Sequence, residues 1–214
     1  MINFQIFAFN SFQVNTIILH DETKECVIID AACYTQQEKE TLVSYIKEAG
    51  LTPKKLINTH NHIDHILGSA FVCDTFDIPL CAHKEGDVFL KTAHSSATVF
   101  GMEIEKIPTV SHYIEEGDII EFGNSSLKVI YTPGHADGSI CLYNKEQNFL
   151  IVGDVLFKDS IGRTDLPTGD YDLLHKNINE KLFSLGDDIK IYPGHGPQTT
   201  TRYEKANNPF LQIL

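Results

Sequence analysis

Short apolar runs broken by polar turns fill the beginning of the chain. Three of these runs are rich in β-branched and aromatic residues, and polar stretches such as NSFQ and DETKE separate them, which is typical of strands. They predict strands at residues 4–9, 15–20 and 26–31. A helical pattern then covers residues 36–50, because Leu42 and Ile46 recur on one face and Gly50 supplies a stop.

The rest of the chain alternates between the same two patterns. A turn and a strand are predicted within residues 51–59, and further strands at 79–83, 118–122, 126–132, 139–144, 148–154 and 189–194. Helices are predicted at residues 63–77, 84–96, 171–185 and 200–207. The four strands between residues 118 and 154 follow one another closely, which is typical of antiparallel sheet. This order predicts an α+β fold with two β-sheets and helices on both outer sides.

The composition is that of an ordinary globular enzyme. The chain has 214 residues, 42% hydrophobic and 21% charged, so we expect a single domain over residues 1–214. Its 29 acidic and 17 basic side chains give a formal net charge of −12, which disfavours binding to phosphate backbones and anionic membranes. We therefore expect a small-molecule substrate, and neither nucleic acid nor a membrane as partner. The oligomeric state stays open.

The cellular location of the protein is inferred from its apolar runs, its first residues and its cysteines. No apolar run is long enough to span a bilayer, and the first residues lack the basic, apolar and small-residue regions of a signal peptide. The five cysteines are odd in number and scattered, which favours reduced, mostly buried thiols. We therefore expect a cytoplasmic protein. The cysteines are Cys26, Cys33, Cys73, Cys81 and Cys141.

The segment T-H-N-H-I-D-H carries the strongest chemical signal. His60 and His62 are two positions apart after a predicted strand, so an extended backbone points both rings to the same side. Asp64 and His65 fall on the first turn of the next predicted helix and can face the same hollow. Each residue alone is equally well explained as a turn or capping residue. Together they favour a site for zinc, iron or manganese.

Three more residues of ligand type follow predicted strands. His135 stands in T-P-G-H, Asp154 in G-D and His195 in P-G-H-G, each on a glycine-containing turn. Any one of them taken singly is well explained by turn chemistry. Loops at strand ends are, however, where catalytic groups usually sit. Added to the first four, these residues bring the set to seven, which suits two ions that share a carboxylate.

The ordered motifs T-H-N-H-I-D-H, T-P-G-H, G-D and P-G-H-G resemble those of the metallo-β-lactamase superfamily over nearly the whole chain. More narrowly, GDVLFKDSIGRTDLPTGD and IYPGHGPQTTTRYEKANNPF are similar to the glyoxalase-II-like (hydroxyacylglutathione hydrolase-like) proteins, above all their short bacterial form. The resemblance implies an αββα sandwich of two mixed sheets, with the site at one edge. It also implies which residues hold each metal ion. One ion would be held by His60, His62 and His135, a second by Asp64, His65 and His195, with Asp154 bridging them.

The activity implied by the resemblance is hydrolysis of a thioester such as S-lactoylglutathione. Two cations about 3.5–4 Å apart would supply a bridging hydroxide, with zinc expected first and iron or manganese as alternatives. Asp64 is the expected catalytic residue that orients the hydroxide. Full-length glyoxalase II has a helical extension with basic residues that grip glutathione, whereas this sequence ends at Leu214. A smaller or different thioester is therefore an open alternative.

Arg163 has two possible roles. It follows Asp154 by nine residues, and its planar guanidinium suits a substrate carboxylate. An ion pair with Asp165 or another carboxylate that anchors the loop is the other interpretation, and the one that the sequence favours.

Rival functions remain. The nearest alternative is a mononuclear-iron persulfide dioxygenase of the same superfamily, in which residues matching His60, His135 and Asp154 hold the iron. A metal-storing module without activity is the non-enzymatic alternative.

Overall fold

The computed structural model describes residues 1–212, in which two six-stranded sheets are the main elements. The first sheet has its strands in chain order. They are β1 (Asn3–Phe9), β2 (Val14–His20), β3 (Glu25–Ile29), β4 (Thr52–Ile57), β5 (Leu80–Ala82) and β6 (His112–Tyr113). β1, β2 and β3 pair antiparallel, and β3 to β6 pair parallel. The sheet is therefore mixed.

The second sheet has the order β14-β13-β10-β9-β8-β7. Its strands are β7 (Ile119–Phe122), β8 (Ser125–Tyr131), β9 (Ile140–Asn144), β10 (Phe149–Gly153), β13 (Lys190–Pro193) and β14 (Thr199–Thr200). β7 to β10 form the antiparallel succession that the sequence predicts, and β13 joins β10 in parallel. A separate two-stranded ribbon contains β11 (Leu156–Phe157) and β12 (Ser160–Ile161).

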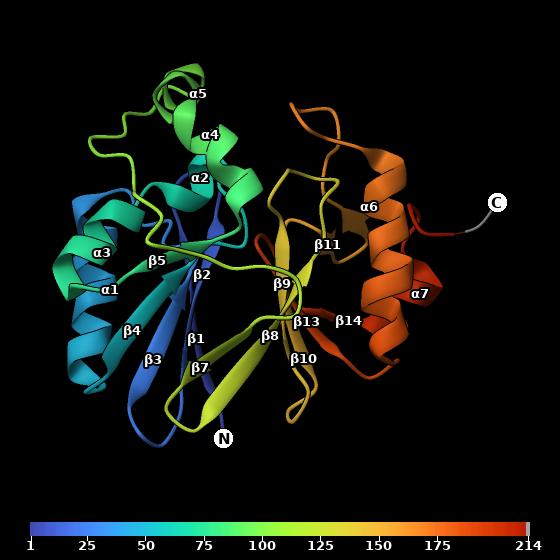
Figure 1. Ribbon diagram of the computed structural model, residues 1–214, viewed down its shortest axis with the longest axis horizontal. Coiled ribbons are helices and arrows are strands. Elements are labelled where there is room, and N and C mark those ends of the chain that lie inside the picture. Colours follow the sequence, from blue (N-terminus) through green and yellow to red (C-terminus); the bar gives the residue numbers. More distant parts are fainter. Residues whose placement is uncertain (213–214) are drawn as a thin grey trace.

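Helices cover the outer face of each sheet (Figure 1). On the side of the first sheet they are α1 (Gln36–Glu48) and α3 (Ser69–Phe76), and on the side of the second sheet α6 (Tyr171–Asn177) and α7 (Thr201–Asn207). α6 continues into a π-helical turn, Ile178–Leu182, and then a 3-10 turn, Phe183–Leu185. Short helices lie beyond one edge of the first sheet: α2 (Ile63–Ile66), a 3-10 turn at Lys84–Gly86, α4 (Asp87–Lys91) and α5 (Ala93–Val99).

Within the described residues, the hydrophobic core of the sandwich has three layers, and a fourth apolar cluster packs α2, α4 and α5 together. The central layer joins the two sheets, with Ile17 and Ile29 from the first sheet packed among Leu127 and Leu142 from the second. An outer layer lies between the first sheet and α1, and another between the second sheet and α6. The molecule is therefore an αββα sandwich, and the α+β prediction is confirmed.

Two of the predicted helices are divided by a break, and the helix predicted at 171–185 is α-helical only as far as Asn177. The helix expected at residues 63–77 is divided at Gly68, whose backbone N–H donates to the carbonyl of Ala31 at 2.8 Å. A Cβ at Gly68 would collide with Cys33, so the chain passes too close to the end of β3 for another residue type. The helix expected at 84–96 is divided at Thr92, whose hydroxyl bonds back to the preceding turn.

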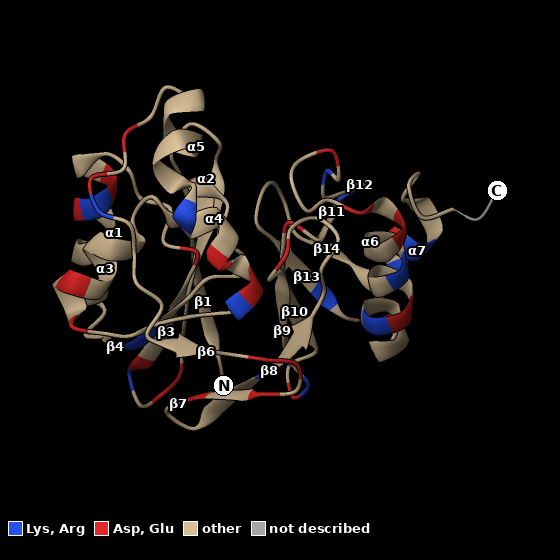
Figure 2. Cartoon of the chain, turned by 45° about the horizontal axis from the view of Figure 1, so that its top comes forward, with Lys and Arg blue, Asp and Glu red and all other residues tan. Residues whose placement is uncertain are grey.

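Two findings on the described residues concern membrane spans and thiols. No helix there is long and apolar enough to cross a membrane. All five cysteines are free thiols, four of them buried, as the scattered pattern predicts. Asp and Glu are spread over the loops and helices of both halves, which is how the net charge of −12 is distributed (Figure 2).

Candidate metal centre

The seven predicted ligand residues come together at one edge of the sandwich, in segments that follow strand ends. The loop after β4 and the single turn of α2 supply His60, His62, Asp64 and His65. The loops after β8, β10 and β13 supply His135, Asp154 and His195. The division of the predicted helix at Gly68 leaves α2 as one turn, with Asp64 and His65 at its start.

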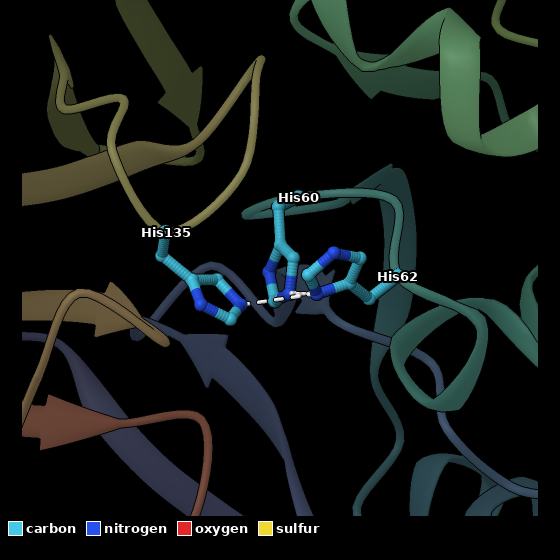
Figure 3. Close-up of side chains that lie close together, drawn as sticks. All are labelled: His60, His62 and His135. Atoms are coloured by element: carbon cyan, nitrogen blue, oxygen red, sulfur yellow. Dashed lines mark hydrogen bonds between the residues drawn. The ribbon is translucent and has the colours of Figure 1, made fainter. Parts of the chain in front are cut away.

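His60, His62 and His135 form a first triad. Nδ1 of His62 lies 3.1 Å from Nε2 of His60 and 3.0 Å from Nε2 of His135. Figure 3 shows the three rings converging from two separate segments of the chain. All three donor atoms lie within 4.8 Å of one another, so one cation can contact all of them.

Asp64, His65 and His195 form a second triad. Nε2 of His195 lies 3.3 Å from Nε2 of His65 and 3.3 Å from Oδ2 of Asp64. His65 is fully buried, whereas Asp64 and His195 keep part of their surface exposed. The second triad therefore offers a donor set of mixed charge that is open on one side.

Asp154 lies between the triads. Its Oδ1 is 3.3 Å from Nε2 of His65, and its Oδ2 is 3.8 Å from Nε2 of His135 and 3.4 Å from Nε2 of His195. In the described chain Oδ1 is buried and has no hydrogen-bond partner. A buried carboxylate oxygen without a donor is costly unless a cation satisfies it. A side chain at Gly194 would collide with this oxygen, which explains the glycine there.

Hydrogen bonds at the outer ring nitrogens fix where the lone pairs point. A carboxylate or a carbonyl can only accept, so each Nδ1 that faces one must carry the proton. These bonds run from His65 to Asp30 (3.0 Å), from His135 to the carbonyl of Arg163 (2.8 Å) and from His195 to the carbonyl of Phe12 (2.9 Å). In the neutral rings Nε2 then bears a lone pair that faces the centre, as metal coordination requires.

Asp30 is a functional candidate that the sequence analysis did not name. It is buried at the end of β3 with a left-handed φ of 51°, and it accepts from the backbone N–H and the hydroxyl of Thr59 at 2.7 Å each. Because the Thr59 hydroxyl donates to Asp30, it must accept from Nδ1 of His60, 3.2 Å away. Asp30 thus orients His65 directly and His60 through Thr59. The sequence does contain a signal for this residue, because Asp30, like Asp154, is an acidic residue that follows an apolar strand.

The histidines of the two triads differ in pKa. Burial, with the neighbouring imidazoles, lowers the pKa of His62 to about 3 and holds that of His60 well below its ordinary value. In the second triad burial acts in the same direction, but Asp154 and Asp64 outweigh it and raise the pKa of His195 to about 10. A cation would take the place of the protons there, so the donor set fits divalent metal ions.

A cavity of about 450 Å³ opens beside the centre. His135, Asp154 and His195 line it, together with residues that include Phe157, Lys158 and Arg163. The Arg163 side chain is 58% exposed, and two of its nitrogens donate to Asp165 at 2.7 Å each. The ion pair favoured from the sequence is therefore formed, at the rim of the cavity. The backbone carbonyl of Arg163 also orients His135.

Residues 10–195 match the family model described as the metallo-beta-lactamase superfamily. The chain belongs to this superfamily. Hydroxyacylglutathione hydrolase GloC of Haemophilus influenzae is 36% identical over 211 residues, 98% of each chain. The BLEG-1 B3 metallo-beta-lactamase structure matches with a TM-score of 0.90 and 34% identity, covering 99% of this chain and all of that one. TTHA1623 in a di-iron-bound form matches with a TM-score of 0.87 and 31% identity, covering 97% of this chain and 100% of that one.

Superfamily membership and the cluster of His and Asp side chains point to the same chemistry. The chain belongs to a superfamily of metallo-hydrolases and has a cluster of His and Asp side chains compatible with divalent ions. The family resemblance expected from the four sequence motifs is confirmed.

Proposed function

We propose that the chain holds two divalent ions, zinc in the first instance, and hydrolyses a thioester such as S-lactoylglutathione or a related acyl-thiol. The observation that carries the proposal is the pair of triads with Asp154 between them. When bound, two such ions make hydroxide available at neutral pH and polarise the carbonyl of the substrate. The likeness to hydroxyacylglutathione hydrolase GloC supports the thioester as substrate.

Asp64 is the residue proposed to orient the attacking water and accept its proton. Its carboxylate faces His195 and its side chain is 15% exposed, so water can reach it. The oxygen of this water then attacks the carbonyl carbon, and the C–S bond breaks. The products are a carboxylic acid and a thiolate. A thiolate leaves without strong help from a general acid, so a thioester makes the smallest demand on the other residues of the site.

Substrate recognition is proposed to involve Arg163 at the rim of the cavity. Its side chain is exposed, and Arg163 lines the cavity together with His135 and Asp154. Its pair with Asp165 is exposed as well, so an ion pair of this kind contributes little and can be exchanged for a carboxylate of the substrate.

The experiment that tests the proposal combines metal analysis with an assay on one preparation. We expect two zinc ions per chain and hydrolysis of S-lactoylglutathione, with release of the free thiol. His62→Ala and Asp64→Ala should each lose the activity and part of the metal. His112→Ala is the matched control, because His112 is exposed on β6 and belongs to neither triad.

The opposing result identifies the rival enzyme. One iron per chain, no turnover of any thioester and oxygen uptake with glutathione persulfide would replace the hydrolase by a persulfide dioxygenase. Two ions with turnover of a simple acyl-thiol but not of S-lactoylglutathione would keep the hydrolase and exclude glutathione as the thiol.

A further inference from the structure

The loop between β1 and β2 lies against the second triad. The segment of residues 10–15, called here the first hairpin loop, consists of the loop 10–13 and the first two residues of β2, Val14 and Asn15. It is far in sequence from the turn that carries His195, yet the two segments are joined by an antiparallel bridge between Val14 and His195. The carbonyl of Phe12 accepts from Nδ1 of His195 at 2.9 Å. The ring of His195 is thus oriented by the backbone of the first hairpin loop.

Asn15 makes three hydrogen bonds to the same turn. Its backbone N–H donates to the carbonyl of Gly194 at 2.7 Å. Its side-chain amide donates to the carbonyls of Pro193 at 3.0 Å and Gly196 at 2.9 Å. The two side-chain bonds bracket His195 on either side. A single amide therefore fixes the path of the backbone from which the His195 ring projects.

Asn10 ties the same loop to the other exposed member of the triad. It is 5% exposed, and its amide donates to the carbonyl of Asp64 at 2.9 Å and to that of Ala32 at 3.0 Å. Its Oδ1 accepts from the backbone N–H of Phe12 at 2.9 Å, which holds the loop in shape. The first hairpin loop therefore contacts both Asp64 and His195.

The first triad is held by other residues. The turn that carries His135 is anchored by Asn177 on α6, whose amide donates to the carbonyl of Pro133 at 2.7 Å. His135 itself donates to Arg163, not to the hairpin. The two triads thus have separate supports at their outer ligands.

We propose that the first hairpin loop is a positioning element for the second triad, and that Asn15 is the residue that sets the place of His195. The inference rests on the proposed pair of metal ions. It predicts that a change at Asn15 weakens one of the two metal sites and leaves the other intact. Removal of such a supporting bond costs metal affinity by about 10–100-fold in other sites.

The test uses Asn15→Asp in two backgrounds, with zinc affinity of the full-length protein measured by competition with a chelator. Asn15→Asp keeps the size of the side chain but replaces its donors with a carboxylate that faces two carbonyls. In His62→Ala, which disables the first triad, we expect it to weaken the remaining site by about 10–100-fold. In His195→Ala we expect no further loss, because the ligand that Asn15 positions is already absent.

Control variants separate positioning from folding. Asn144→Asp removes a comparable amide, which donates to the carbonyl of Ser126 at 2.9 Å. Because Asn144 belongs to neither triad, this variant should leave both zinc affinities unchanged. Asn177→Asp should show the reverse pattern, weakening the site that survives in His195→Ala. Thermal unfolding of each metal-free variant reports the cost to the fold, and Asn15→Ala replaces Asn15→Asp if the latter does not fold.

Two outcomes overturn the inference in distinguishable ways. Equal effects of the Asn15 variant in both backgrounds, or none in either, would refute the positioning role while wild type still binds two ions and hydrolyses its substrate. One ion per wild-type chain would refute the pair of ions and the inference together.

Discussion

Both triads of the candidate metal centre direct imidazole rings into the same space, but the pKa values of the rings are controlled differently in the two triads. His60, His62 and His135 are kept neutral by burial, which lowers the pKa of each. In the second triad the carboxylates of Asp64 and Asp154 raise the pKa of His65 and His195 in spite of burial. An all-imidazole triad is therefore ready for a cation, whereas the acidic triad holds protons that a cation must displace.

The two triads also differ in how far along the sequence their members and supporting residues lie. The first triad draws two of its three members from one short segment, and Thr59 beside them completes a hydrogen bond to His60. The outer members of the second triad depend on the first hairpin loop, 183 residues from His195 in the case of Phe12. Each triad thus joins two residues of the segment 60–65 to one distant loop, which lies 73 residues from His62 in the first triad and 130 residues from His65 in the second.

The largest expected effect comes from removing the residue that both triads share. Asp154→Ala should release both ions and lower kcat by about 10³-fold or more, because the Asp154 carboxylate lies near members of both triads. Metal content and thioester turnover are measured together. Asp188→Ala, an exposed acid paired with Arg202, is the control. Retention of two ions by Asp154→Ala would contradict the bridging role.

Asp30→Asn should affect both triads and so removes the contrast between them. The variant keeps the size of Asp30 but loses an acceptor for Thr59 or for His65. We expect each metal site to weaken by about 10–100-fold, as loss of a supporting carboxylate does elsewhere. Chelator competition in the His62→Ala and His195→Ala backgrounds checks this. An effect confined to one background would show that Thr59 transmits nothing to His60.

Arg163→Ala should leave both triads loaded and act on substrate alone. We expect KM for an anionic thioester to rise by about 5-fold, with kcat nearly unchanged and a smaller effect at high salt, since the guanidinium is exposed. Asp165→Ala, which frees the guanidinium, should lower KM or leave it unchanged. If KM for a neutral acyl-thiol rises equally, Arg163 does not recognise the anion.

The smallest effect on activity is expected at the far end of the sandwich, where no metal ligand lies. Although burial opposes it, hydrogen bonds from Thr23, Ser125 and Asn124 lower the pKa of Asp21 to about 2. A lowered pKa gives stability that is present above the unfolded value of 3.8 and is lost as the pH falls toward 2.

Asp21→Asn should therefore flatten this acid dependence. The fall in Tm of the metal-free protein between pH 4 and pH 2 should shrink by roughly 3 °C, with thioester turnover at neutral pH unchanged. An unaltered acid profile would show that Asp21 is not the group responsible.

The sequence predicts the sandwich and the seven residues of the candidate centre because both depend on local patterns. Apolar runs mark the strands, and His or Asp on a glycine turn after such a run marks a ligand position. The supports are harder to predict. Phe12 acts through its carbonyl, which every residue type has, and Asn15 binds a turn that only the three-dimensional fold brings near. The break at Gly68 likewise depends on the approach of β3, which no helical periodicity encodes.

The bond between the first hairpin loop and the His195 turn has a consequence for how the centre is completed during synthesis. The ribosome produces His60, His62, Asp64 and His65 early, and the hairpin is present before all of them. His195 emerges last, so the second triad closes only after β13 has joined β10. Because contacts of such long sequence separation form late, a nascent chain carries His60, His62 and His135 before His195 exists. Metal captured at that stage would occupy the histidine-only triad first.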